Sequence, residues 1–408
     1  SAAAIMAQLL PSIPILLALI SWACGVPTAR NISATRHFQV DAEDAHLSVP
    51  QLILKYGYGA EVHHATTEDG YILELHRIPK PGAPAVLLMH GLLCSSADWV
   101  SIGPGNGLAY LLADQGYDVW LGNARGNRYS RKHQTLTPKM FAFWQFSWHE
   151  IGFYDLPALI DYVLEKTGRS KLHYIGHSQG TTSFFVMTST RPEYNAKIAL
   201  AQALAPVAFT ESMQSPLLRI MSLFQDTLAA LFETFGVAEF APSNAILHDI
   251  SKLLCTAQIS NNLCLNVLFQ LAGANPDQVD LKLIPILMGH TPAGASTRQI
   301  VHYAQGVRSG QFRQYDHGTI KNRFMYGTPD PPVYNLTRVS APVVFYYALN
   351  DYLAVPVDVE RLSRGIGNLA GYRQVRMETF NHLDFLFAKD VRTLLYEEIL
   401  GNVRLYGG

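Results

Sequence analysis

Charged residues are scarce in this sequence of 408 residues: they make up 15% of it, against about 25% in a typical soluble domain. Lys and Arg together number 31 and Asp and Glu 32, so the net charge is only -1. Nucleic-acid binding depends on a basic field, which this chain lacks. The composition therefore excludes nucleic acid as a main partner, and the 49% of hydrophobic residues leaves room for apolar surface patches.

Cysteine is also rare, with four residues and no C-x-x-C pair, and no H-E-x-x-H motif occurs. These absences exclude a disulfide-dense small domain, a zinc ribbon, thioredoxin-like redox chemistry and the commonest zinc-protease motif. We therefore expect neither a metal site nor a cofactor.

A long apolar segment is missing as well, because the run Ile13–Gly25 is too short to span a bilayer comfortably. Its length is that of the h-region of a signal peptide, and small residues end it. We predict that residues 1–25 are a signal peptide, with cleavage as late as Ala29 as the alternative. The triplets at Asn31 and Asn335 are N-glycosylation sequons and fit the same secretory pathway.

Short apolar strands alternate with helical segments along much of the remaining chain. Apolar segments separated by helices are typical of βαβ units, so we expect a mainly parallel sheet flanked by helices. The predicted strands are Tyr71–Ile78, Val86–Met89, Asp118–Leu121, Leu172–Ile175, Pro342–Leu349 and Gln374–Thr379, and the clearest helices are Leu108–Gln115 and Asp155–Lys166.

From about Phe209 to Asp330 the pattern changes to helical segments interrupted by proline, with no convincing strand. The strand rhythm then resumes at Pro342. We therefore predict a core formed by residues 26–208 and 336–408, with a helical insertion at residues 209–335.

The most informative motif is Gly176-His177-Ser178-Gln179-Gly180, which follows a predicted strand and precedes a helix-like segment. In such a tight turn the two glycines remove side chains that would collide, and the serine hydroxyl is left exposed at a helix N-terminus. The motif predicts that Ser178 is a nucleophile.

A serine nucleophile requires a histidine base and a carboxylate that orients it, in the chain order Ser, acid, His. Asp351 lies where the strand Pro342–Leu349 ends, and His382 lies beyond the last predicted strand. Asp358 is the rival acid, although it falls seven residues further along the loop or helix. We predict Asp351 as the acid and His382 as the base.

The negative charge that develops on a tetrahedral intermediate needs two backbone N–H donors, one of them from the residue after the nucleophile. Gln179 occupies that position. The loop that starts at His90-Gly91, after the strand Val86–Met89, is placed to supply the second donor, for which Leu92 is the candidate.

With these residues in place, the sequence resembles the acid lipases of the α/β-hydrolase superfamily from about Val49 to Leu405. The matching stretches are Tyr58–Pro79, His90–Trp99, Asp118–His133, Phe143–Asp155, Gly176–Gly180, Asn350–Val359 and Asn381–Phe385. The resemblance implies the α/β-hydrolase fold with a helical cap and lid, the triad Ser178, Asp351 and His382, and an oxyanion hole formed by Leu92 and Gln179.

The resemblance also implies a function: a lipase that hydrolyses neutral lipid esters at a lipid–water interface through an acyl-enzyme. Triacylglycerol is the first expected substrate and cholesteryl ester the second. A peptidase or thioesterase on the same fold is a rival enzyme, and a non-catalytic lipid carrier or yolk-type protein is a rival of another class. We expect a monomer without a transmembrane span, either secreted or lysosomal.

Two further predictions concern the insertion. Cys255 and Cys264 lie nine residues apart within it, whereas Cys24 leaves with the leader and Cys94 falls in the core, so we predict a Cys255–Cys264 disulfide; two free thiols are the alternative. The stretch from about Phe240 to Leu271 is apolar with few charges, which suits a mobile lid; static packing of a helical cap is the alternative.

Overall fold

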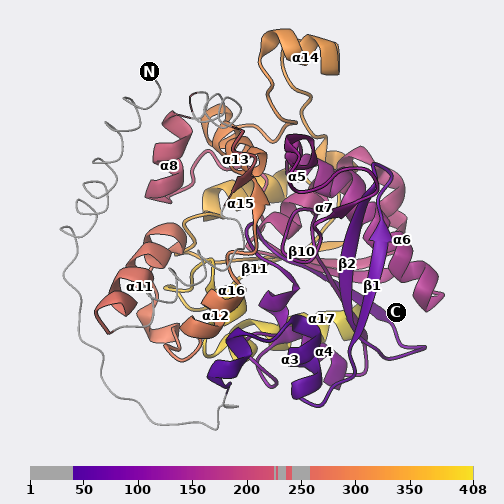
Figure 1. The fold of residues 1–408 in the computed structure, drawn as a ribbon, viewed down its shortest axis with the longest axis vertical. Coiled ribbons are helices and arrows are strands. Elements are labelled where there is room, and N and C mark those ends of the chain that lie inside the picture. The colour runs from indigo at the N-terminus through magenta and orange to yellow at the C-terminus, as the bar shows by residue number, and fades with distance from the viewer. Residues whose placement is uncertain (1–39, 225–226, 228–235, 241–257, 408) are drawn as a thin grey trace. The chain divides into compact units, whose positions relative to one another are not determined.

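The fold was analysed in a computed structural model that describes residues 40–224, 227, 236–240 and 258–407 (Figure 1). The predicted signal peptide, residues 1–25, and Asn31 lie outside these residues, as does Cys255. Cys264 belongs to a described helix, but its side chain is not among those described. The disulfide and most of the predicted lid therefore stay predictions.

Nine strands of the described residues form one sheet, in the order β1-β2-β4-β3-β6-β7-β10-β11 with β5 paired to β2. The strands are β1 (Glu61–Thr66), β2 (Tyr71–Ile78), β3 (Ala85–Met89), β4 (Asp118–Gly122), β5 (Lys132–His133), β6 (Leu172–His177), β7 (Ile198–Leu204), β10 (Val343–Tyr347) and β11 (Leu369–Gln374).

The pairing from β4 through β3, β6, β7 and β10 to β11 is parallel, whereas β2 pairs antiparallel with β1, β4 and β5. Every residue of β3 and β6 is buried, as expected for central strands that are covered on both faces. The prediction of a mainly parallel sheet is confirmed.

β7 was not predicted, and of the six predicted strands the last is misplaced. It runs Leu369–Gln374 and pairs in parallel with β10, whereas the prediction placed it at Gln374–Thr379. β11 lies at the edge of the sheet and its side chains are exposed or half-buried, so it lacks the apolar pattern that reveals a buried strand.

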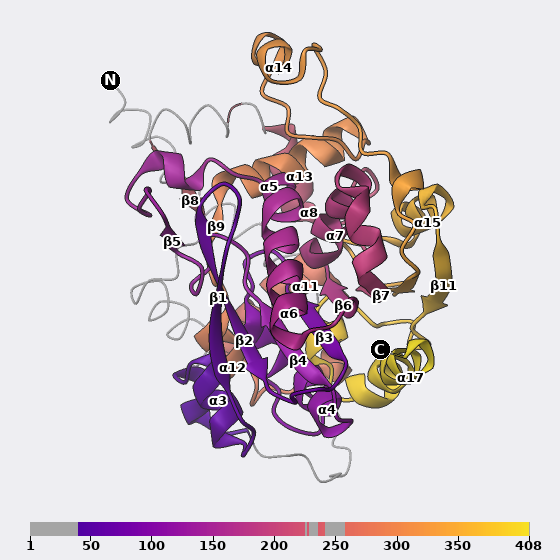
Figure 2. The same cartoon turned by 90° about the vertical axis from the view of Figure 1, so that its right-hand side faces the viewer.

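Helices cover both faces of the sheet. Figure 2 shows the strands crossing the picture from β1 to β11, with α6 overlapping them, α7 and α15 above, and α3, α4 and α17 below. The bounds are α3 (Val49–Lys55), α4 (Leu108–Asp114), α5 (Trp148–Glu150), α6 (Leu156–Thr167), α7 (Gln179–Thr190), α15 (Pro356–Gly365), α16 (Asp384–Phe387) and α17 (Glu397–Tyr406).

Shorter 3₁₀ and π turns connect these elements. They are η1 (Ala42–Ala45), η2 (Ser96–Trp99), η3 (Phe141–Trp144), η4 (Ile151–Asp155), η5 (Pro192–Lys197), η6 (Pro276–Gln278), η7 (Leu336–Arg338) and η8 (Arg392–Tyr396). The π turn η4 leads directly into α6, which carries Pro157 in its first turn and ends at Gly168 in the left-handed conformation, φ 67°. Both features are favoured helix boundaries.

The insertion supplies a separate group of helices, which lies on one side of the sheet in Figure 1. Its described helices are α8 (Pro216–Leu223), α11 (Gln258–Ala272), α12 (Ile284–His290), α13 (Thr297–Ser309) and α14 (Thr319–Tyr326). It also contains two short strands, β8 (Glu239–Phe240) and β9 (Ala295–Ser296), which pair antiparallel. Strands of two residues are too short to produce a recognisable sequence pattern.

Among the helices that the structure describes, none combines the length and the apolar character needed to cross a membrane.

Candidate active site

Ser178 lies in the tight turn between β6 and α7. Its backbone has φ 52° and ψ -117°, a conformation that is rare for a residue with a side chain. The Ser178 amide donates to the carbonyl of Leu204 at 3.0 Å, which ties the turn to the end of β7. The sequence motif has therefore folded into the strained strand-to-helix turn that presents a serine at the carboxyl edge of the sheet.

Glycine is required at both ends of this turn, and a third glycine in the facing loop allows a close approach. A Cβ atom on Gly176 would lie 2.9 Å from the Gly180 carbonyl carbon, and one on Gly180 would lie 2.4 Å from the Met89 oxygen. At Gly91 an added Cβ would lie 3.3 Å from the Ser178 Cβ and 3.7 Å from its Oγ. These distances show that the loop after β3 packs directly against Ser178.

Ser178, His382 and Asp351 form a continuous chain of hydrogen bonds. The Ser178 Oγ lies 2.8 Å from His382 Nε2, and His382 Nδ1 lies 2.8 Å and 3.0 Å from the two Asp351 carboxylate oxygens. The Asp351 and His382 side chains are buried. The structure therefore brings together the three residues that the sequence selected.

Asp351 is held in place by its own loop, because its Oδ1 accepts from the amides of Leu353 and Ala354, each at 2.8 Å. The rival acid, Asp358, lies in the first turn of α15, where its carboxylate accepts from the Ser212 amide at 3.0 Å. Of these two carboxylates only Asp351 is hydrogen bonded to His382.

The two predicted oxyanion-hole residues, Gln179 and Leu92, lie in segments next to Ser178. Gln179 is the first residue of α7, where an amide has no acceptor within its own helix. Leu92 lies in the loop that packs against Ser178, between Gly91 and Leu93, whose φ is 62°. The two predicted oxyanion-hole residues thus come from adjacent parallel strands, β6 and β3.

His90 holds the loop after β3 in shape. Its Nδ1–H donates to the Gly91 carbonyl at 2.7 Å, and its Nε2 accepts from the Ala124 amide at 3.1 Å and from the side chain of Asn127 at 3.2 Å. Burial lowers the pKa of His90 to about 4. The ring therefore stays neutral in mildly acidic solution, as its acceptor role at Nε2 requires.

The loops that carry the acid and the base are joined through a segment of the insertion. Asn350, which precedes Asp351, donates its side-chain amide to the Ala274 carbonyl at 2.8 Å. Asn381, which precedes His382, donates to the Gly273 carbonyl at 2.9 Å. The Ala272 carbonyl accepts from the backbone amides of both loops, at Tyr352 and His382.

Gly273 is the point of closest approach in this arrangement. Its φ is 104°, and a Cβ atom there would lie 2.0 Å from the Asn350 carbonyl oxygen. Only glycine fits at this position without moving the loop that leads into Asp351.

A buried carboxyl extends the same connection. Asp384 Oδ2 accepts from the Asn275 side chain at 2.7 Å and from the Asn381 amide at 2.9 Å. Burial raises the pKa of Asp384 to about 6, and the nearby charge of Asp351 adds to that rise. Asn275 and Asp384 thereby link the insertion to the histidine loop.

The insertion also contacts the two oxyanion-hole loops. The Ala293 amide donates to the Leu93 carbonyl at 2.6 Å, and the Gln179 side chain donates to the Gln299 side chain of α13 at 2.6 Å. The segment Ala272–Gln299 is therefore hydrogen bonded to all four loops that carry the predicted site residues. We name it the clamp segment.

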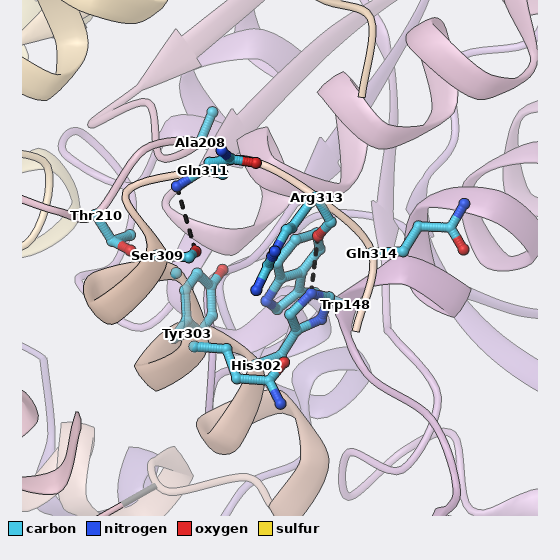
Figure 3. A pocket seen from close by; sticks show the side chains of 11 residues that line it. Trp148, Ala208, Thr210, His302, Tyr303, Ser309, Gln311, Arg313 and Gln314 are labelled. Atoms are coloured by element: carbon cyan, nitrogen blue, oxygen red, sulfur yellow. Dashed lines mark hydrogen bonds between the residues drawn. The ribbon is translucent and has the colours of Figure 1, made fainter. Parts of the chain in front are cut away.

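A small cavity lies beside α13 (Figure 3), and none of the three triad residues lines it. Its volume of about 10 Å³ is enough for a single water molecule and too small for an acyl chain. Trp148 stacks on His302 at its wall, with ring centroids 3.6 Å apart, as Figure 3 shows. The cavity is a feature of packing between the insertion and the core, separate from the triad.

In the described part of the chain, no group of three or more His, Cys, Asp or Glu side chains is arranged to hold a metal ion. The sequence did not reveal the clamp segment. Asn350 and Asn381 could have been noticed because they precede the acid and the base, but Gly273, Asn275 and Gln299 carry no local signature.

Comparisons with known proteins identify the family of this chain. The family model described as the alpha/beta hydrolase fold matches residues 84–389, and the model of a partial alpha/beta-hydrolase lipase region matches residues 49–103. Lipase 1 of Drosophila melanogaster is 49% identical over 362 residues, covering 88% of this chain and 80% of the fly protein. Gastric triacylglycerol lipase of Bos taurus is 40% identical over 366 residues, covering 88% and 91%.

Among solved structures, a soluble variant of monoglyceride lipase from Saccharomyces cerevisiae in complex with a substrate analog superposes with a TM-score of 0.50. The match covers 86% of this chain and 99% of that chain, at 14% sequence identity. At this level of identity the likeness supports the fold alone.

Proposed function

This chain belongs to the lipases of the α/β-hydrolase fold and is a carboxylic ester hydrolase, and we propose that it cleaves neutral lipid esters through an acyl-enzyme on Ser178. The observation that carries the proposal is the hydrogen-bond chain from Ser178 through His382 to Asp351. Triacylglycerol is the proposed first substrate and cholesteryl ester the second. Gastric triacylglycerol lipases are among the relatives.

In the proposed acylation step, His382 Nε2 takes the proton of the Ser178 hydroxyl while Oγ attacks the ester carbonyl carbon. The 2.8 Å separation between these atoms suits that transfer. Asp351 keeps the Nδ1–H tautomer in place and stabilises the imidazolium that forms. His382 then returns the proton to the alcohol oxygen, which leaves as the C–O bond breaks.

The amides of Leu92 and Gln179 are proposed to donate to the carbonyl oxygen as it becomes negative. In the second half of the reaction, water attacks the acyl carbonyl and gives a proton to His382. The fatty acid leaves and Ser178 regains its proton, so no group beyond water is consumed.

The rival hypothesis, a lipid carrier that retains the fold without catalysis, does not account for this geometry. A carrier needs neither the strained Ser178 turn nor an Asp351 carboxylate fixed by two amides against a buried imidazole. Strain of this kind persists at functional sites because the surrounding structure maintains it.

Two aspartates provide the sharpest test of the proposed triad. Asp351→Asn should lower kcat on a short soluble ester by about 10⁴-fold, because the imidazole then loses the partner that orients it. Asp358→Asn should retain most of the activity, since Asp358 accepts from Ser212 and does not contact His382. Loss of activity in the second variant alone would show that the acid has been misassigned.

Covalent labelling tests the nucleophile independently. An organophosphonate ester should label the wild-type protein once, at the peptide that contains Ser178, and should not label Ser178→Ala. A panel of triacylglycerol, cholesteryl and short soluble esters, assayed at acidic and neutral pH, would then define the substrate.

The proposed destination is the secretory pathway, followed by secretion or delivery to lysosomes. Asn335 is exposed and lies at the start of the turn η7, so a glycan could be attached to it from the solvent side. The proposed cap is residues 209–335, with a lid between about Phe240 and Leu271. Peptide mass mapping of the unreduced, glycosylated protein would test Asn31, Asn335 and the Cys255–Cys264 bridge together.

A further inference from the structure

The helix α14 exposes three large apolar side chains to solvent. Ile320, Phe324 and Met325 are 77%, 87% and 56% exposed. Ile320 and Phe324 are four positions apart and lie on the same side of the helix, and Met325, next to Phe324, extends the exposed apolar surface to the adjacent side. These three side chains are the apolar patch of α14. Figures 1 and 2 both show α14 projecting away from the other elements.

The opposite side of α14 is firmly attached. Asn322 is buried, and its side chain donates to Asp316 and to the Pro329 carbonyl, each at 2.8 Å, while accepting from the His317 amide at 2.9 Å. Tyr326 donates to the Tyr315 carbonyl at 2.8 Å. The apolar patch is thus presented by a helix that is fixed on its inner side.

Single exposed hydrophobic residues are normal on protein surfaces, but three large ones on one projecting helix indicate an interaction site. Nothing in the hydrogen bonding of α14 requires them, because Asn322 and Tyr326 make the anchoring contacts. We therefore expect the patch to contact an apolar partner outside the protein.

The charges of α14 narrow the choice of partner. The helix carries Lys321 and Arg323, both exposed, and no acidic residue. The nearby Asp316 is hydrogen bonded to Arg313 at 3.0 Å, which balances its charge. Asp330 is an exposed carboxylate after the C-terminal end of α14, and the two cations of the helix outnumber it. An apolar patch with cationic neighbours is the composition of segments that lie in the interface of an anionic lipid surface.

We propose that α14 is an interfacial anchor, which inserts Ile320, Phe324 and Met325 into a lipid surface bearing anionic headgroups. Lys321 and Arg323 would contact those headgroups. The inference rests on the proposed function in one respect, since an enzyme that cleaves water-insoluble esters must first attach to their surface. It assigns that attachment to a region distinct from the proposed lid.

The test is co-sedimentation of the full chain with vesicles of ether-linked phospholipids, which contain no ester to hydrolyse. One set is pure phosphatidylcholine and the other contains phosphatidylglycerol. The variant I320S/F324S/M325S should lose at least tenfold in partitioning to the anionic vesicles. K321Q/R323Q should lose the preference for anionic over neutral vesicles, because only the electrostatic attraction is removed.

The matched control replaces other exposed apolar residues. Leu54 and Leu405 are 58% and 78% exposed and lie on α3 and α17. L54S/L405S should bind vesicles like the wild type, and Phe324→Ser alone should already weaken binding. Equal binding by wild type and the α14 triple variant would overturn the proposal, as would an equal loss in the control.

Hydrolysis of a short soluble ester separates the anchor from the catalytic proposal. All the variants should keep kcat/KM on that ester within about twofold, because α14 contributes no residue to the triad. Vesicle binding that depends on α14 in a protein without esterase activity would support the anchor and refute the proposed function. A triple variant that changes only from dimer to monomer would identify α14 as a self-association surface and overturn the anchor.

Discussion

The clamp segment, Ala272–Gln299, and the helix α14 belong to the same predicted insertion but have opposite surroundings. The clamp segment is hydrogen bonded to the loops of Ser178, Asp351, His382 and Leu92. α14 makes its polar contacts with its own flanking residues and turns its apolar side chains outward. One part of the predicted insertion is therefore tied to the loops of the Ser178–His382–Asp351 hydrogen-bond chain, whereas another part is not.

This difference restricts any lid motion. A movement that carried Gly273 or Asn275 away from the core would break the hydrogen bonds that join them to the acid and histidine loops. We therefore expect the opening motion to be confined to residues before Ala272. The clamp segment would remain in place during catalysis.

Among substitutions that compare the clamp segment with α14, one at a glycine of the clamp segment should give the largest loss of activity. Gly273→Ala places a Cβ atom against the Asn350 carbonyl, and we expect kcat/KM on a soluble ester to fall by about 100-fold as the Asp351 loop shifts. Gly327→Ala is the matched control, because Gly327 also has a positive φ, 76°, but nothing lies within 4 Å of its Cβ position. It should lower stability by about 1 kcal/mol and leave kinetics unchanged. Similar kinetics in both variants would contradict the assignment of the clamp.

The buried Asp384 should give a pH signature. Its pKa in the folded protein, about 6, is above the ordinary aspartate value, so its contribution to stability is present below about pH 4 and is lost as pH rises through 6. Asp384→Asn removes this titration. The wild-type free energy of unfolding, minus that of the variant, should therefore fall by on the order of 2 kcal/mol between pH 4 and pH 7.

Urea denaturation across that pH range measures the difference. The control is Asp330→Asn, which removes one exposed carboxylate next to α14. A wild-type-minus-variant difference that is independent of pH for Asp384 would show that this carboxyl is not perturbed in the folded protein.

Two asparagine substitutions, one in the clamp segment and one in α14, should give the smallest effect on activity. They should also distinguish the two regions, because only the first should change kcat. Asn275→Ala removes one donor from the Asp384 carboxyl, and we expect kcat to fall about tenfold with KM nearly unchanged, because the histidine loop loses part of its support. Asn322→Ala removes the side-chain hydrogen bonds of Asn322 that hold α14 to its flanking residues, and it should lower thermal stability without changing kcat on a soluble ester. An unchanged kcat in the first variant would leave the clamp a purely structural element.

Local patterns in the sequence were sufficient for much of the fold and for the triad. The turn around Ser178 is determined by five consecutive residues, and Asp351 follows the end of a strand that an apolar run predicts. His382 was selected because it lies beyond the last predicted strand, although that strand ends earlier than predicted. The edge strand β11 was misplaced because its residues are only partly buried. A strand is recognised in a sequence by the pattern of apolar residues that burial requires, and β11 lacks that pattern.

The clamp segment and the outward face of α14 were decided only by the tertiary structure. Gly273 and Asn381 are separated by 108 residues, and Gln179 and Gln299 by 120, so no local periodicity connects them. The side of α14 that faces solvent is likewise determined by the hydrogen bonds of Asn322 and Tyr326 to the segments that flank the helix. Hydrophobic periodicity reports how a segment meets its immediate surroundings, whereas contacts between distant segments exist only after the chain has packed.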